Sequence, residues 1–184
     1  LGFSACGIAS ATHLVSEQHR FENAMEQNFH AGMRYLERNI DRRFDPRRYF
    51  PDCRSVIVAL FHYPVPSLDD DFYKVARYAH LPDYHLFMKE MLEELAAPFH
   101  HAGTAYKTTV DTSPVTEKNW AVKAGLGSIG KNTLFRSEKG SFCLIGTILT
   151  TLSLNPDPEK EIPCENCNRC VKACPTGALK PYQL

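Results

Sequence analysis

Apolar residues recur at regular intervals in the first third of the chain, and their spacing predicts a helix. Between residues 17 and 36, every fourth position is apolar in one register: Phe21, Met25, Phe29 and Met33. This spacing predicts one apolar helix face, interrupted or bent near Gly32, in which the methionines fill core space. The next segment, "RRFDPRRYFPD" at 42–52, contains two prolines and predicts a surface connection.

A continuous apolar run predicts the centre of the fold. The segment "SVIVALFHYP" at 55–64 is rich in β-branched residues and ends at a proline, which predicts a central strand buried on both faces. A second strand, "TAYKTTVDT" at 104–112, is expected to end at Asp111. The segment "GSFCLIGTILTTL" at 140–152 predicts one long strand or two short ones.

Helices are predicted between these strands. The segment "PDYHLFMKEMLEELAAPF" at 82–99 separates apolar from charged positions, as in an amphipathic helix, and this helix should end near Pro98. The segment "SPVTEKNWAVKAG" at 113–125 predicts another helix, with Ser113 as its N-cap and Gly125 as its stop.

Two polar segments lie outside these elements. The acidic run at 69–71 precedes a possible helix at 71–79, so a solvated capping role is favoured over a metal site. The segment "SLNPDPEKEIP" at 153–163 is polar and punctuated by prolines, which predicts a domain boundary near residue 160. We therefore expect an α/β (α+β) body, residues 1–160, with a mixed sheet flanked by helices, and an appended segment, residues 161–184.

Composition supports a packed body and excludes several classes of protein. The 184 residues are 43% hydrophobic and 11% aromatic, which is enough for a core. The formal net charge is zero, and no long stretch has the basic excess needed to neutralise a phosphate backbone, so this chain alone is expected to bind nucleic acid weakly or not at all. The apolar runs are too short to span a membrane and the first residues do not resemble a secretory signal, so a cytoplasmic location is expected.

Four of the seven cysteines are crowded near the end of the chain. They follow the pattern C-x2-C-x2-C-x3-C-P: Cys164, Cys167, Cys170 and Cys174. In bacterial ferredoxins this run places three thiolates on one [4Fe–4S] cluster and the fourth on another. Structural zinc and unmetallated thiols are the alternatives, although zinc prefers two separated cysteine pairs. Under the ferredoxin interpretation both clusters lack ligands, because the other cysteines are scattered through the body.

Two further segments resemble cofactor-binding motifs but do not match them fully. "GLGSIG" at 125–130 has the glycine spacing of a dinucleotide-binding loop, but it follows a predicted helix instead of a strand. A tight glycine turn that places Lys131 and Asn132 at the polar edge of a ligand remains reasonable. Asp83 and His85 begin a cobalamin-ligating D-x-H-x-x-G pattern whose glycine is absent, so His85 is interpreted as a surface or satisfied histidine.

Asp111 lies where a predicted strand meets a predicted helix, flanked by Thr112 and Ser113. From these residues alone, a cap or turn carboxylate is favoured over a catalytic acid.

Several segments together resemble the epoxyqueuosine reductases, cobalamin-dependent iron–sulfur enzymes of queuosine synthesis in tRNA. They occur in family order along the whole chain: "GFSACGIA", "FPDCRSVIVAL", "RYAHLPDYH", "VDTSPVTEKNWAVKAGLGSIGKNT", "GSFCLIGTILT" and "CENCNRCVKACPTGAL". The resemblance implies a cobalamin domain akin to flavin-reductase and vitamin B12-processing folds, followed by part of a ferredoxin-like module. It also implies that the chain is a truncated member, inactive alone and with clusters damaged or absent, because complete members carry a second cysteine run and a tail.

The resemblance also implies roles for particular residues. Electrons pass from two [4Fe–4S] clusters, supplied by an external donor, to cobalamin, and the epoxide oxygen leaves as water. Asp111 corresponds to the aspartate to which protonation is assigned. The matched residues expected to contact cobalamin are Tyr78, Asp83, Tyr84, Asp111, Gly127, Ile129, Lys131 and Asn132.

Two other functions are kept beside this one. The first is a related corrinoid iron–sulfur reductase with another substrate, and the second is a non-catalytic electron-transfer protein of the ferredoxin type. Under the preferred reading the full-length protein binds tRNA, and no membrane is involved.

Overall fold

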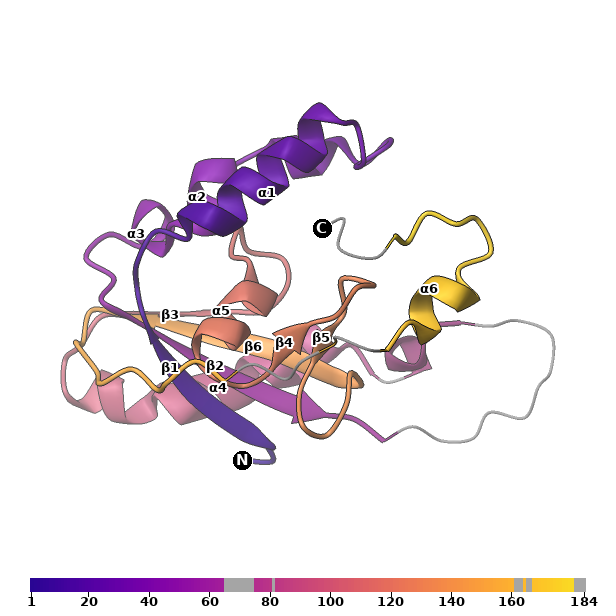
Figure 1. Ribbon diagram of the computed structural model, residues 1–184. Coiled ribbons are helices and arrows are strands. Elements are labelled where there is room, and N and C mark those ends of the chain that lie inside the picture. Colours follow the sequence, from indigo (N-terminus) through magenta and orange to yellow (C-terminus); the bar gives the residue numbers. More distant parts are fainter. Residues whose placement is uncertain (65–74, 81, 161–163, 165–166, 181–184) are drawn as a thin grey trace.

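A four-stranded sheet forms the centre of the protein, as the computed structural model in Figure 1 shows. The structure describes residues 1–64, 75–80, 82–160, 164 and 167–180. The strands, in spatial order, are β1 (Ala5–Ser10), β2 (Ser55–His62), β6 (Cys143–Thr150) and β3 (Tyr106–Thr109). Helices flank this sheet, which confirms the predicted α/β (α+β) class.

The apolar run predicted as a central strand is β2. It pairs with β1 on one side and with β6 on the other, and its first six residues are buried. Successive side chains point to opposite faces, so Val58 joins one core cluster and Ala59 the other. The segment 140–152 forms one strand, β6. Every strand pair in the described part of this sheet is antiparallel, where a mixed sheet was expected.

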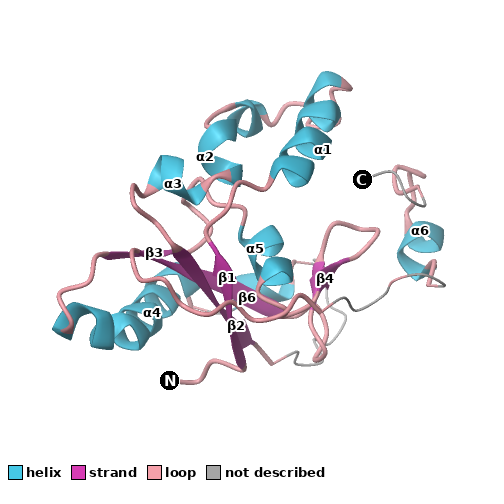
Figure 2. Ribbon diagram, turned by 60° about the vertical axis from the view of Figure 1, so that its left-hand side comes forward, coloured by secondary structure: helices cyan, strands magenta, loops and turns pink. Residues whose placement is uncertain are grey.

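The two faces of the sheet are covered by different helices, as Figure 2 shows for α4 and α5. Helix α4 (Tyr84–His101) buries Met88 and Leu92 against one face. It continues past Pro98, the predicted end, because the carbonyl of Pro98 still accepts the N–H of Ala102 in a last turn. The opposite face is covered by α5 (Glu117–Lys123), whose Trp120 is fully buried.

The helix predicted for residues 17–36 is shorter than expected. Helix α1 (Val15–Glu26) ends before Asn28, which has a left-handed backbone with φ of 57°. Phe29 and Met33 are therefore 62% and 44% exposed, and the prediction that they belong to a buried helix face is wrong. A 3₁₀ turn, η1 (Arg34–Glu37), follows.

The proline-containing segment after it is helical, where a surface connection was predicted. It forms α2 (Ile40–Phe44) and α3 (Pro46–Tyr49). The side chain of Asp45 accepts the N–H of Arg47, and Pro46 occupies the first helical position, where its missing N–H costs nothing. Phe44 and Pro46 are buried, so this segment contributes to the core.

Local capping also moves the start of α5. Its N-cap is Thr116, so the prediction that Ser113 caps the helix is wrong. Gly125 has a φ of 70° and stops the helix as predicted. The chain then forms a small hairpin of β4 (Ser128–Ile129) and β5 (Phe135–Arg136).

The polar segment near residue 160 lies against the body. The backbone N–H of Asp157 donates to the carbonyl of Ile8 at 2.9 Å, and the N–H of Ile8 donates to the carboxylate of Asp157 at 2.8 Å. Beyond it, α6 (Arg169–Ala173, yellow in Figure 1) carries Cys170 and lies away from the sheet. The boundary itself stays a prediction.

The acidic run at 69–71 lies outside the described residues. Of the helix predicted at 71–79, the described part begins at residue 75 and contains the 3₁₀ turn η2 (Arg77–His80). None of the described helices combines the length and the apolar character that a membrane crossing requires.

Candidate active site around Asp111

Asp111 follows β3 directly and has an unusual backbone. Its φ is 53°, in the left-handed region that non-glycine residues seldom occupy. Its side chain is 63% exposed, and Oδ2 accepts a hydrogen bond of 2.6 Å from the hydroxyl of Tyr84. This bond connects the end of β3 with the first residue of α4 across 27 positions of sequence. The carboxyl is thus accessible and held from one side.

The beginning of α4 orients a histidine toward the same carboxyl. Asp83 caps the helix by accepting the N–H of His85 at 3.0 Å, and its Oδ1 lies 2.8 Å from His85 Nδ1. His85 Nε2 is 3.7 Å from Asp111 Oδ2. The contact with His85 holds the pKa of Asp83 below its ordinary value. His85 is satisfied by Asp83, as the sequence predicted, and it also faces Asp111.

Tyr84 acts as a hydrogen-bond donor in this arrangement. Burial, and then the hydrogen bond to Asp111, raise the pKa of Tyr84 above its ordinary value, so its hydroxyl keeps its proton at neutral pH. Its ring stacks on His85 at 4.1 Å and meets the ring of Tyr78 edge-on at 5.9 Å. Tyr78, Asp83, Tyr84 and Asp111 are therefore connected through these contacts and His85, while their role as cofactor contacts stays a prediction.

Glu117, which the sequence analysis did not select, lies on the other side of Asp111. Its Oε1 accepts the backbone N–H of Asp111 at 2.5 Å. Burial raises the pKa of this partly buried carboxyl to about 8, and the charge of Asp111 adds to the rise, while Lys118 opposes it. Glu117 stands six residues after Asp111, inside a motif already quoted, but only the fold shows that the two meet.

The other predicted cofactor contacts lie on the β4–β5 hairpin. A Cβ on Gly127 would come within 2.1 Å of the carbonyl oxygen of Arg136, so only glycine fits there. Ile129 is 37% exposed, and the side chain of Asn132 accepts the N–H of Leu134 within the turn. The hairpin is joined to the start of α5 by Lys118, whose Nζ donates to the carbonyl of Thr133 at 3.0 Å.

Lys131 contacts the cysteine segment. Its Nζ lies 2.9 Å from Asn168 Oδ1 and 3.4 Å from the carbonyl oxygen of Cys167. In the part of the chain that the structure describes, no three cysteine, histidine or carboxylate side chains converge as metal ligands. The structure therefore places the cysteine run beside the hairpin without assembling a ligand set for it.

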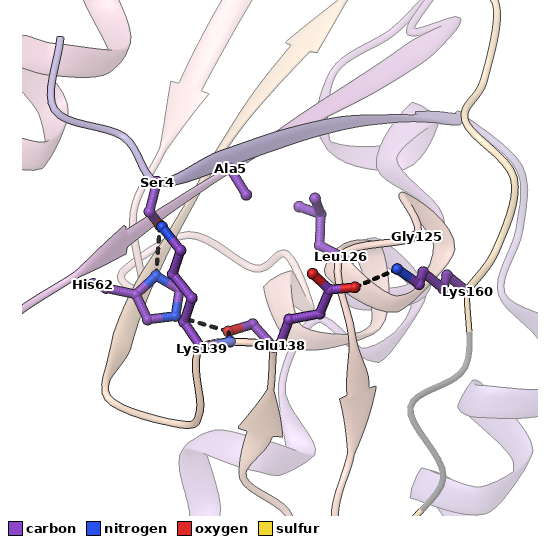
Figure 3. A pocket seen from close by; sticks show the side chains of 9 residues that line it. Ser4, Ala5, His62, Gly125, Leu126, Glu138, Lys139 and Lys160 are labelled. Carbon is purple, nitrogen blue, oxygen red and sulfur yellow. Dashed lines mark hydrogen bonds and ion pairs between the residues drawn. The ribbon is translucent and has the colours of Figure 1, made fainter.

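A cavity near the end of β2, shown in Figure 3, is lined by Ser4, His62 and the loop after β5. His62 bridges the hydroxyls of Ser4 at 2.5 Å and Ser137 at 2.7 Å, and Glu138 forms an ion pair with Lys160. Burial lowers the pKa of His62. A volume of about 190 Å³ is too small for a corrinoid.

Comparison with known proteins shows which family the chain resembles. Residues 43–112, which include the group around Asp111, match the profile described as "Epoxyqueuosine reductase QueG, DUF1730". Residues 163–180 match the "4Fe-4S binding domain" profile. Over these segments the chain is similar to the epoxyqueuosine reductase family.

Individual relatives agree with the profiles. An epoxyqueuosine reductase of Cyclobacterium marinum is 40% identical over 97% of this chain and 60% of its own length, and one of Leadbetterella byssophila is 37% identical over 100% and 62%. The structure of the Streptococcus thermophilus epoxyqueuosine reductase superposes with a TM-score of 0.89 at 28% identity, covering 100% of this chain and 51% of that protein. This chain thus spans about 60% of the curated relatives named here.

Two further structures describe states of relatives. One is an epoxyqueuosine reductase with an epoxyqueuosine-modified tRNA-Tyr stem loop, with a TM-score of 0.80 at 27% identity over 97% of this chain and 49% of that one. The other, from Bacillus subtilis, has a loop with a catalytic aspartate swung out of the active site, with a TM-score of 0.80 at 25% identity over 97% and 49%.

Proposed function

We propose that this chain forms the cobalamin-binding, proton-donating part of an epoxyqueuosine reductase that acts on tRNA. The observation that carries the proposal is Asp111, whose exposed carboxyl accepts a hydrogen bond from Tyr84 inside the segment that matches the family profile, while Glu117, just beyond that segment, accepts its backbone N–H. The reaction removes the epoxide oxygen as water, which consumes two electrons and two protons. Cobalamin, when bound, supplies the electrons to the substrate.

Each residue around Asp111 has a separate role in the proposed proton transfer. Asp111 donates one of the two protons to the epoxide oxygen, because its carboxyl is the exposed acidic group at the centre of the cluster, and the second proton comes from water. Tyr84 directs the carboxyl through its short hydrogen bond, and Glu117 holds the backbone N–H of Asp111. His85, 3.7 Å from the carboxyl, is placed to return the proton after each turnover.

The surface around this group fits a large, partly apolar cofactor. Exposed apolar or aromatic side chains occur next to the cluster and on the hairpin: Tyr78, Leu86, Ile129, Leu134 and Phe142. Such side chains lose contact with water when a macrocycle covers them, which favours binding. The residues proposed to hold cobalamin are those of the cluster and of the hairpin: Tyr78, Asp83, Tyr84, Gly127, Ile129, Lys131 and Asn132.

The cysteine run is proposed to carry electrons. Cys164, Cys167 and Cys170 would bind one [4Fe–4S] cluster, and Cys174 a second one, with the remaining ligands coming from outside this run. Lys131 contacts the carbonyl of Cys167 and the side chain of Asn168. These contacts keep the cysteine segment next to the hairpin that is proposed to face the cofactor. An external donor reduces the clusters, and the protein works in the cytoplasm.

Replacing the proposed acid tests this function directly. In the cobalamin- and iron-loaded protein that contains this chain, Asp111→Asn should lower the turnover of an epoxyqueuosine-containing tRNA stem loop by at least about a hundredfold, because proton donation is lost. Cobalamin binding, followed by the corrinoid absorption spectrum, should be unchanged.

Asp52→Asn is the matched control, since Asp52 is also exposed and has a φ of 61°. Turnover that survives Asp111→Asn would remove the acid role. Cobalamin binding without any turnover of the unsubstituted protein would indicate another substrate, and absence of cobalamin binding would contradict the whole proposal.

A further inference from the structure

The segment from η1 to α3 carries a local positive charge that the neutral net charge of the chain conceals. Between residues 34 and 48 there are six arginines and only three acidic residues. The arginines are Arg34, Arg38, Arg42, Arg43, Arg47 and Arg48. All except Arg43 are exposed. Helix α2 contacts both α1 and α3, and these helices lie above the sheet in Figure 1, so the arginines belong to one part of the chain's fold.

The acidic residues of this segment neutralise few of these charges. Asp45 pairs with Arg47 at 2.8 Å, and Glu37 pairs with His30 at 2.9 Å. Arg43 donates to two backbone carbonyls, which fixes the turn instead of neutralising a carboxylate. Among the described residues, no ion pair involves the other four arginines, here called the open arginines: Arg34, Arg38, Arg42 and Arg48.

Exposed aromatic side chains accompany the open arginines. Tyr35, in η1, is 59% exposed, and Phe29, in the turn before η1, is 62% exposed. A solvated charged face gains nothing from exposed aromatic rings, because each ring leaves apolar area in water. Single-stranded nucleic acid uses both kinds of group, since phosphates pair with guanidinium and unstacked bases stack on aromatic rings.

This segment also contacts the loop that carries Asp111. The backbone N–H of Thr116 donates to the carbonyl of Arg43 at 3.2 Å, and the hydroxyl of Tyr49 lies 3.4 Å from Ser113 Oγ. Burial opposes the change, but the hydrogen-bond contacts of that hydroxyl with Ser113 and Lys107, and then the positive charges of Lys107 and Arg42, lower the pKa of Tyr49. The segment that carries the open arginines therefore packs against the loop that follows Asp111.

We infer that the open arginines, with Phe29 and Tyr35, form a binding surface for the backbone and unpaired bases of an RNA hairpin whose modified base enters the site at Asp111. The inference rests on the proposed function for the identity of the RNA. An anionic membrane would use the same charges, but it would place no demand on a position next to a catalytic loop.

Salt-dependent RNA binding tests this surface without any need for cofactor or turnover. A fluorescein-labelled RNA hairpin with a tRNA anticodon-stem sequence would be titrated with the chain at several salt concentrations, and binding followed by fluorescence anisotropy. Replacing the open arginines together by alanine should weaken binding at least about tenfold and should lower the slope of log affinity against log salt by about 3. Replacing them together by lysine should keep most of the slope.

Lys89→Ala is the matched control, because Lys89 is exposed on α4, which covers the opposite face of the sheet. Circular dichroism checks that each variant is folded. Equal weakening by Lys89→Ala, unchanged binding in the alanine variant, or binding to phosphatidylserine vesicles in preference to the hairpin would overturn the inference.

A second readout separates this surface from the proposed reaction. In the loaded protein that contains this chain, the alanine variant should raise KM for the tRNA stem loop and leave kcat nearly unchanged, because the arginines bind RNA away from the reacting atoms. If arginine-dependent hairpin binding holds while no turnover is found, the proposed reaction fails and the surface stands. Turnover at unchanged KM in the alanine variant would overturn the surface alone.

Discussion

Asp111 is the residue on which the proposed chemistry depends, and its neighbours decide how its carboxyl is presented. Tyr84 donates to its carboxyl and Glu117 accepts from its backbone, so the two contacts hold it from different elements. The left-handed backbone of Asp111 is unfavourable by itself for a residue with a Cβ. These two hydrogen bonds offset that strain and keep the carboxyl exposed to a substrate.

Glu117 gives this group a measurable pH dependence. Its pKa of about 8 in the folded protein lies above the ordinary 4.5, because burial disfavours the ionised form. The folded state therefore holds this proton more tightly than the unfolded state, and the free energy of unfolding should fall as pH rises from about 4.5 through 8. Below this range Glu117 is protonated in both states and does not lower the free energy of unfolding.

Glu117→Gln should remove that fall, because glutamine cannot ionise while its oxygen still accepts the N–H of Asp111. Above pH 8 the variant should be more stable than the original protein by roughly 1 to 3 kcal/mol, since the partly buried site is still reached by solvent. Denaturant unfolding at a series of pH values measures this. Glu90→Gln, on the exposed side of α4, is the control and should leave the pH profile unchanged. If the profile of Glu117→Gln ran parallel to that of the unsubstituted protein, Glu117 would not titrate in this range.

At the scale of elements, the hairpin β4–β5 depends on close approach of the backbone. The position of Gly127 against the carbonyl of Arg136 leaves no space for a side chain, whereas Gly125 is required for its positive φ and for its contact with Pro158. The hairpin thus packs between α5 and the cysteine segment because glycines allow it.

Gly127→Ala should destabilise the protein by about 1 to 3 kcal/mol, because the new methyl group would force the two strands apart. Gly32→Ala is the matched control: nothing lies within 4 Å of the added Cβ and its φ is not positive, so it should be neutral or slightly stabilising. Thermal unfolding of both variants checks this, and equal melting temperatures would mean that the hairpin can adjust freely.

At the scale of the whole molecule, the proposed function makes electron supply depend on a metal cluster bound by the cysteine run. The 4Fe-4S profile covers the run, and Lys131 ties it to the body beside the candidate cofactor surface. Cys53 and Cys143 lie in the body, where burial raises the pKa of each thiol to about 11, so they are poor thiolate ligands at neutral pH.

The anaerobically prepared protein that contains this chain should hold iron and sulfide, and Cys167→Ala should remove a large share of the iron. Cys6→Ala is the control, because Cys6 is an exposed cysteine outside the run. Iron analysis and the visible spectrum measure the effect. Zinc in place of iron, or iron content that does not change in Cys167→Ala, would contradict the ferredoxin interpretation.

Sequence alone determined the features that depend on neighbouring residues. Local sterics and burial account for three of them: the β-branched run of β2, the amphipathic pattern of α4 and the helix stop at Gly125. The cysteine spacing is also local, because all four cysteines belong to one short stretch of chain. Periodicity failed at Phe29 and Met33, because it does not register a left-handed residue that ends a helix.

Tertiary structure decided which side chains meet. The contact between Tyr84 and Asp111 spans 27 positions, and it exists because α4 packs across the strands that place β3 at the sheet edge. The pKa of Glu117 likewise depends on burial that no local pattern predicts. Local sequence sets the conformation of each element, but the distances and the desolvation that make a site arise only when distant elements pack together.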